Sequence, residues 1–149
     1  MIRTENEYQL TYRRLSELQQ QLSEQEQQLR DEGLPDDQMK RALDPLRSFA
    51  LGLKEELEMY EKLQRGDLET IGDVINLHNL GRTLIALRIV YRITQRELAD
   101  RLAIDESQIS RWERNEYHGI TIERASKILD ALGVRARTIC EEVGLLNTA

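Results

Sequence analysis

Hydrophobic side chains recur every seven residues near the start of the chain. One series holds Tyr8, Leu15, Leu22 and Leu29. A second series between them holds Leu18, with polar breaks at Thr11 and Gln25. A seven-residue repeat places such positions on one side of a long helix. The spacing therefore predicts a helix from about Thr4 to Arg30, and the sequence Gly33-Leu34-Pro35 is expected to end it.

The same pattern returns after this turn and predicts a partner helix. Its positions again form two series, Met39, Leu46, Leu53 and Tyr60, with Leu43, Ala50, Leu57 and Gln64 between them. Asp36 and Asp37 supply negative charge that favours a helix start, and Gly66 suits the position just after a helix end. Because Pro45 lies inside this segment, we expect a kink or a break there. Two heptad helices joined by a short turn most simply form an antiparallel hairpin, resembling a coiled coil.

From about residue 79 the pattern changes to short helices with marked starts. The pairs that mark these starts are Thr94 with Glu97, Asp105 with Gln108, and Thr121 with Arg124. Such pairs satisfy the free backbone amides of a first helical turn. They predict three short helices after a first one from about Asn79 to Ile93, and a fifth from Arg135 to Val143. In the fourth helix, the side chains expected to face inward are Ile122, Ala125, Ile128 and Leu129.

These patterns together predict an all-α protein of three parts. Residues 1–66 form the helical hairpin, residues 67–78 a linker, and residues 79–149 a five-helix domain. Few aromatic residues and only two prolines agree with this class. The linker is apolar, with Ile71, Val74, Ile75 and Leu77, so we expect it to pack against one of the two domains.

The sequence lacks the residues and motifs that several classes of function require. Cys140 is the only cysteine, which argues against a disulfide and a cysteine-rich zinc site, and the two histidines stand forty residues apart, so no metal is expected. The sequence shows neither a phosphate-binding loop nor a nucleophile motif, and we therefore expect no enzyme activity and no cofactor. An apolar run of about 20 residues and a signal peptide are also missing, which predicts a cytoplasmic protein with no membrane partner.

The charge of the chain is unevenly distributed. The net charge is −6 overall, and residues 1–70 account for all of it, with 10 basic against 16 acidic residues. Residues 79–137 carry 11 basic against 8 acidic residues, a net charge of +3. Local potential matters more than total charge for the approach of DNA, so the second half is the part suited to nucleic acid.

The second half also resembles a known family of domains. The residues that carry the resemblance are Thr94-Gln95, Glu97-Leu98-Ala99, Leu102, Ile109-Ser110 and Trp112-Glu113, together with the segment Ala131-Leu132-Gly133-Val134. They are similar to the signature of Xre-type helix-turn-helix domains, the class of phage repressors and Cro proteins. The resemblance covers about residues 79–134. It departs from the family at Ala103, where glycine is usual, and a positive φ there would cost about 1 kcal/mol.

The resemblance implies a DNA-binding surface on the second helix of the motif, which enters the major groove. It places Glu106, Ser107, Gln108 and Arg111 at base-facing positions. Thr94 and Gln95 start the preceding helix and suit phosphate oxygens. Arg114, Asn115 and His118 follow the groove-entering end and are further phosphate candidates, although a solvated charged surface would also explain Arg114. Trp112 is in phase with Ile109 and is expected to belong to the core.

These observations predict a sequence-specific double-stranded DNA-binding protein, a transcriptional regulator acting as a homodimeric repressor. The hairpin is expected to serve self-association. The order of the two parts resembles that of Xre-type regulators with an N-terminal helical extension. The extension is also similar to an antitoxin's toxin-binding segment, which accompanies an Xre-type domain, so the alternative is an antitoxin that neutralises a toxin protein and regulates its own operon. A purely structural helical adaptor is the third possibility.

Overall fold

The computed structural model describes residues 1–67 and 79–137, and the predicted all-α class is confirmed in them. The helices are α1 (Glu5–Asp31), α2 (Asp36–Gln64), α4 (Leu80–Val90), α5 (Gln95–Leu102), α6 (Glu106–Arg114) and α7 (Ile122–Leu132). These two ranges contain no strand. The predicted linker lies outside them apart from Asp67. Most of the predicted fifth helix also lies outside, and its first residues, 135–137, are not helical.

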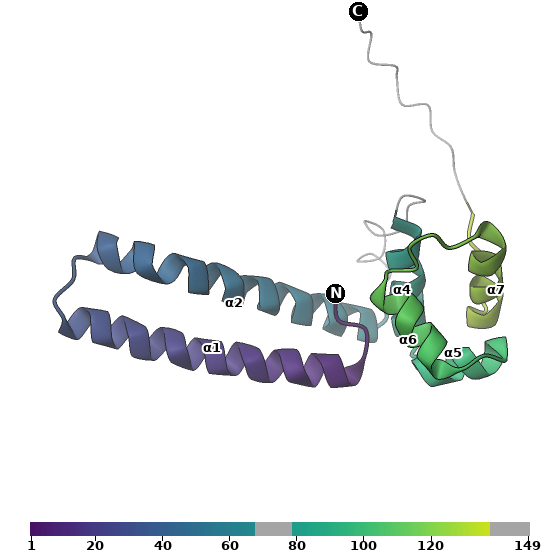
Figure 1. Cartoon of the computed structure of the whole chain (residues 1–149), viewed down its shortest axis with the longest axis horizontal. Helices are drawn as coiled ribbons and strands as arrows, with labels where there is room; N and C mark the ends of the chain where they lie inside the picture. The colour runs from purple at the N-terminus through teal and green to yellow at the C-terminus, as the bar shows by residue number, and fades with distance from the viewer. Residues whose placement is uncertain (68–78, 138–149) are drawn as a thin grey trace, which may run out of the picture.

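Helices α1 and α2 form the expected antiparallel hairpin, a long arm that projects from the compact group of short helices (Figure 1). The Oγ1 atom of Thr4 caps α1 by accepting a hydrogen bond from the amide of Glu7 at 3.2 Å. Beyond the other end of α1, Gly33 adopts a positive φ of 74°. The side chains buried in the predicted seam include Leu15, Leu18, Met39, Leu43 and Leu57. The heptad pattern therefore identified the buried side of both helices.

We expected either a kink or a break at Pro45, and the structure shows no break in α2. The helix is continuous from Asp36 to Gln64. A proline removes one helical hydrogen bond and crowds the carbonyl four residues earlier. Here both Pro45 and Arg41 are exposed. Water can therefore solvate the carbonyl of Arg41 that has lost its partner.

The short helices start and end where the capping residues predict. Thr94 and Glu97 form a reciprocal capping box at α5, and Asp105 and Thr121 cap α6 and α7. Ala103 ends α5 in the left-handed conformation, with φ 54°, so the usual geometry is retained without glycine.

The prediction of which α7 side chains face inward was wrong for one residue. Ala125, Ile128 and Leu132 are buried, but the side chain of Ile122 is 83% exposed. Ile122 is the first residue of the helix. The three-residue spacing from Ile122 to Ala125 matches the buried side of the helix, but the first position of α7 is left uncovered.

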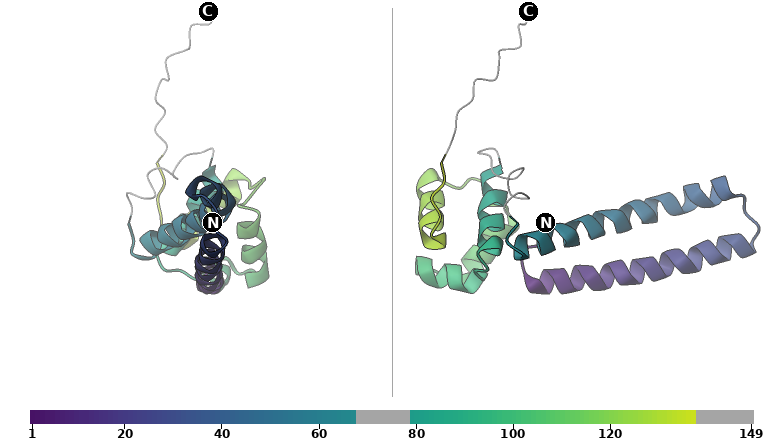
Figure 2. Two further views of the ribbon diagram at one scale, coloured as in Figure 1. Left: turned by 90° about the vertical axis from the view of Figure 1, so that its left-hand side faces the viewer. Right: turned by 180° about the vertical axis from the view of Figure 1, so that it is seen from behind.

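The hydrophobic core runs without interruption from the base of the hairpin into the short helices. Leu57, Tyr60 and Leu63 of the hairpin belong to the same buried cluster as Leu84 and Ile85 of α4. Views from the end and from behind show the base of the arm against α4 (Figure 2). Packing, and not only the connecting segment, therefore attaches the arm.

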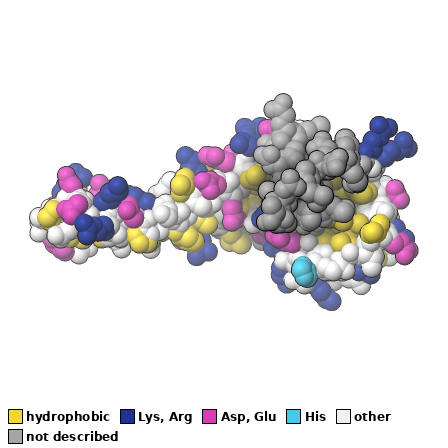
Figure 3. Space-filling view, turned by 90° about the horizontal axis from the view of Figure 1, so that it is seen from above, with side chains coloured by type: hydrophobic (Ala, Val, Ile, Leu, Met, Phe, Trp, Pro, Cys, Tyr) yellow, Lys and Arg dark blue, Asp and Glu magenta, His cyan; other side chains and the backbone are white. Residues whose placement is uncertain are grey.

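Acidic and basic side chains are interspersed along the visible surface of the arm (Figure 3). Several form pairs one helical turn apart, such as Arg30 with Glu26 at 3.1 Å and Lys54 with Glu58 at 3.8 Å. Exposed pairs of this kind contribute little stability each. The surface of the arm is thus solvated, and its stability comes from the apolar seam.

Candidate nucleic-acid interface

Helices α5 and α6 are joined by a three-residue turn and form a helix-turn-helix. Asp105 caps α6, because its Oδ1 accepts a hydrogen bond from the amide of Ser107 at 2.8 Å. Hydrogen bonding from the side chain of Ser107, together with this bond from its backbone amide, favours the charged form and lowers the pKa of the Asp105 carboxyl. The pKa of Glu97 is lowered in the same way by hydrogen bonds from the backbone and side chain of Thr94. Both caps therefore stay charged at neutral pH, where they fix the start of each helix.

The outer side of α6 carries all four residues that were predicted to face bases. Glu106, Ser107, Gln108 and Arg111 are exposed, whereas Ile109 on the other side is fully buried. Within residues 1–67 and 79–137, no hydrogen bond or ion pair occupies the side chain of Arg111. The outer side of α6 thus presents the guanidinium of Arg111 and the amide of Gln108 to solvent, while its inner side is packed in the core through Ile109.

The residues predicted to contact phosphates fall into two groups. Arg114, Asn115 and His118 are exposed at and beyond the C-terminal end of α6. Thr94 and Gln95 lie at the start of α5, and both already have partners. The hydroxyl of Thr94 donates to Glu97 Oε2 at 2.9 Å, and the amide of Gln95 donates to Glu113 Oε2 at 2.7 Å. Gln95 is half-buried and retains one amide hydrogen for a further contact.

A buried ion pair lies directly behind the recognition helix. Arg88 of α4 donates to both carboxylate oxygens of Glu113, at 2.5 Å from Nε and 2.7 Å from Nη2. The Arg88 side chain is 5% exposed, and Glu113 is not exposed at all. Arg88 Nη1 also donates to the carbonyl of Ile93 at 2.9 Å. This pair fixes α6 to α4 and orients Gln95 through the shared carboxylate.

Sequence analysis did not identify this pair, although a signal was present. Arg88 stands four residues after Leu84, and Glu113 stands four residues after Ile109. Both charged residues therefore occupy the apolar side of a short helix. Opposite charges in such positions on two neighbouring helices indicate a buried ion pair.

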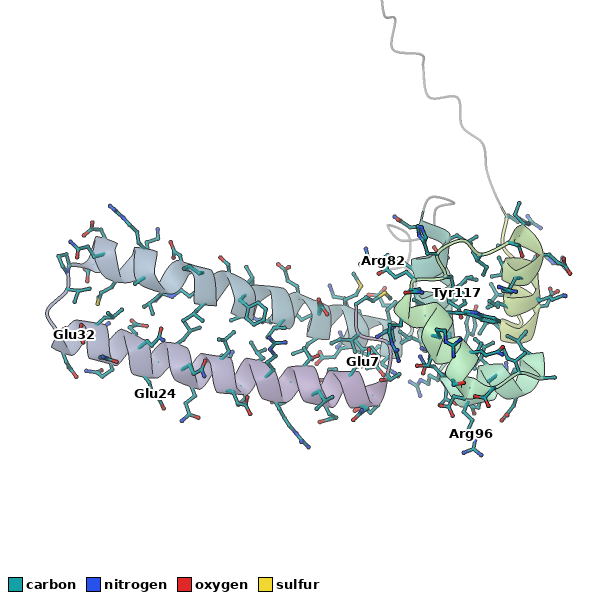
Figure 4. The ribbon with its side chains drawn as sticks, viewed as in Figure 1. Glu7, Glu24, Glu32, Arg82, Arg96 and Tyr117 are labelled. Atoms are coloured by element: carbon teal, nitrogen blue, oxygen red, sulfur yellow. The ribbon has the colours of Figure 1, made fainter. Side chains whose placement is uncertain are left out.

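Two exposed arginines near the start of α5 were also missed. Arg92 holds a positive φ of 55° in the turn before α5. Arg96 points away from the short helices into solvent (Figure 4). Neither has a hydrogen bond or ion pair among the described residues. They flank Thr94 and Gln95 and add positive charge to the edge at which the resemblance places phosphates.

The aromatic residues behind α6 complete the packing. Trp112 is half-buried, with its ring 6.3 Å from that of Tyr117 and the Arg124 guanidinium 4.8 Å from its centroid. This agrees with the expected packing role of Trp112. Burial raises the pKa of Tyr117 above its ordinary value. The turn at Glu116 and Tyr117 approaches Gly81 so closely that a Cβ on Gly81 would overlap the carbonyl oxygen of Glu116.

Two other types of site are absent from residues 1–67 and 79–137. These ranges contain no cluster of His, Cys, Asp or Glu that could hold a metal ion. Within the same ranges, no helix has the length and apolar character needed to cross a membrane.

Comparison with known proteins agrees with this geometry. No curated protein and no solved structure matched the chain. Residues 84–139 match the helix-turn-helix family model, which covers a little over a third of the chain. The matched segment includes α4 from its fifth residue onward and all of α5, α6 and α7. This part of the chain is therefore similar to the helix-turn-helix domains that the family model describes.

Proposed function

We propose that the protein binds double-stranded DNA sequence-specifically by placing α6 in the major groove. The observation that carries this proposal is the outer surface of α6, where Ser107, Gln108 and Arg111 are exposed on a helix anchored by Ile109 and Glu113. A rigid recognition helix with free polar side chains suits the reading of base edges.

Each outward side chain suits a different base. The free guanidinium of Arg111 can donate to both O6 and N7 of guanine, and the amide of Gln108 can pair with adenine. Glu106 can accept a hydrogen bond from the amino group of cytosine. Ser107 can donate or accept, and it is therefore less selective.

The phosphate contacts would come from residues at both ends of α6. Arg114, Asn115 and His118 lie at one end, and the start of α5 with Thr94 and Gln95 lies at the other. Because the hydroxyl of Thr94 is used in its cap, we expect the backbone amides at this helix start to contribute more than that side chain. The net charge of +3 in residues 79–137 supports attraction to the DNA backbone.

The proposed role is transcriptional repression by a homodimer. A single unit of this size contacts too few base pairs for a useful specificity ratio, so two units on an inverted repeat are expected. The hairpin supports this proposal because it exposes large apolar side chains at several positions along both helices. These are Leu10, Tyr12, Phe49, Leu51 and Met59. An apolar surface on the arm suits contact with another protein chain.

The same apolar side chains favour a second candidate function. An antitoxin would use the hairpin to bind a toxin protein and the helix-turn-helix to regulate its own operon. The two candidates differ in what the arm contacts. Light scattering of the isolated protein at tens of micromolar should give a dimer under the first candidate. A monomer that binds an asymmetric site would favour the second.

Selection from a randomised pool of duplexes tests DNA binding directly. The protein should enrich an inverted repeat at moderate salt. Arg111→Ala should lose about 1–3 kcal/mol on the selected duplex and relax the preference at one base step in each half-site. Gln95→Ala should weaken all sequences more evenly. Failure of the wild-type protein to bind any duplex, even at low salt, would contradict the proposal.

A further inference from the structure

The segment that precedes α1 takes part in the buried network behind the recognition helix. The carbonyl oxygen of Arg3 accepts a hydrogen bond from Arg88 Nη2 at 2.9 Å. The same nitrogen donates to Glu113 Oε2, and that oxygen also accepts from Gln95. A continuous chain of hydrogen bonds thus links the base of the hairpin to α6 and to the start of α5.

This segment is held firmly at the base of the arm. Ile2 is 4% exposed and belongs to the same buried cluster as Leu84 of α4. Glu7 accepts from the backbone amide of Arg3 at 2.9 Å and from its guanidinium at 2.6 Å. Glu7 lies at the end of the hairpin nearest the short helices (Figure 4). Apolar burial on one side and Glu7 on the other therefore fix the position of the Arg3 carbonyl.

The same segment also lies beside the expected DNA-facing edge. A groove between the hairpin base and the short helices is lined by Arg3 and Thr4 on one side, and by Gln95 and Glu106 on the other. Glu106 is the first residue of α6. Displacement of Arg3 would therefore act close to the first residues of α5 and α6, the two helices of the motif.

We propose that residues 2–3 are positioning residues for DNA binding, because they hold Arg88, and through it Glu113 and Gln95, in the arrangement that the recognition helix requires. This inference rests on the proposed DNA-binding function. It makes the hairpin base a route of regulation, since a partner that draws this segment away would also loosen α6. In this mechanism the hydrogen bonds to Glu113 are either formed or broken, and the partner would shift the equilibrium towards the broken state.

Ile2→Ala tests whether the segment before α1 supports DNA binding through Arg88 and Glu113. Leu18→Ala is its matched control. Both side chains are apolar and buried, at 4% and 6% exposure, but Leu18 lies within the arm and away from the network. On a duplex selected by the wild-type protein, Ile2→Ala should bind about two- to thirtyfold more weakly, the range expected for residues that couple sites. Leu18→Ala should bind within about twofold of wild type. Urea unfolding should show that both variants are folded under the assay conditions.

The NMR signal of Arg88 Nε–H gives a readout that a merely structural role would not change. It should shift and exchange faster with solvent in Ile2→Ala, and it should be unchanged in Leu18→Ala. If Ile2→Ala does not fold, Glu7→Gln releases Arg3 by another route. Its control is Glu26→Gln, which removes the same charge from a pair on α1 at similar exposure, 40% against 35% for Glu7. Only Glu7→Gln should weaken DNA binding and shift the Arg88 signal.

The outcomes separate this inference from the proposed function. A wild-type protein that selects no duplex would overturn both. Equal DNA binding by wild type and Ile2→Ala, or by the two glutamine variants, would overturn the inference alone. A weakened Ile2→Ala with an unchanged Arg88 signal would also overturn it, because the effect would not pass through the network.

Discussion

Replacing Glu113 by alanine should destabilise the protein more than any single change on its surface. The carboxylate is fully buried and accepts three side-chain hydrogen bonds, two from Arg88 and one from Gln95. Its removal leaves the Arg88 guanidinium buried without a counter-charge. Breaking a buried ion pair in this way costs about 3–5 kcal/mol.

This cost is large relative to the total stability of the fold. Domains of ordinary size have a free energy of unfolding of about 5–15 kcal/mol. Urea unfolding followed by circular dichroism should therefore show a clear fall in the midpoint for Glu113→Ala. Glu123→Ala is the matched control, because Glu123 pairs with Lys127 at 2.9 Å but is 79% exposed. The control should lose less than about 1 kcal/mol.

A double replacement tests whether the cost comes from the unpaired charge. Arg88→Met with Glu113→Leu removes both charges and fills the space with apolar atoms. Exchanges of this kind are often close to neutral, so the double variant should be more stable than Glu113→Ala. A loss below about 1 kcal/mol for Glu113→Ala would refute the argument, because it would show that water reaches Arg88.

Three further changes test local features of the fold. Gly81→Ala should cost at least about 2 kcal/mol in urea unfolding, since its Cβ would overlap the carbonyl of Glu116 and only backbone movement could relieve the contact. Ala103→Gly should raise the free energy of unfolding by up to about 0.5 kcal/mol, because the relieved left-handed strain of about 1 kcal/mol exceeds the added entropy of the unfolded chain; a lower free energy of unfolding would contradict this. The hydrogen bond to Glu61 raises the pKa of Tyr8 from 10.0 to about 12. The stability from this bond should therefore be complete below pH 10 and lost as pH rises through 12, and ultraviolet titration of Tyr8→Phe should lack one tyrosine that ionises near pH 12.

Local sequence signals predicted most of the helices. The pairs Thr94 with Glu97 and Asp105 with Gln108 marked helix starts correctly, because capping depends on residues only a few positions apart. Heptad spacing likewise identified the hairpin seam. In both cases the information needed lies within one or two helical turns.

Features that depend on distant residues could not be obtained in this way. The overlap of Gly81 with Glu116 joins residues that are far apart in sequence. The positions of Arg88 and Glu113 on the apolar sides of their helices indicated two buried charges, but their hydrogen bonds to each other and to Gln95 depend on the tertiary packing. The burial of Ile2 depends on how the arm packs against α4. The exposure of Ile122 depends on what packs around the start of α7, which its own spacing does not reveal.

The sequence preference of α6 tests the central claim most directly. Wild type, Arg111→Ala and Arg96→Ala should each be used to select duplexes from one randomised pool at one fixed salt concentration. Arg96 is the control because it is exposed outside the recognition helix. The account predicts that Arg111→Ala loses the preference for one base pair in each half-site, whereas Arg96→Ala selects the wild-type sequence with lower affinity. An unchanged preference in Arg111→Ala would contradict the placement of α6 in the major groove.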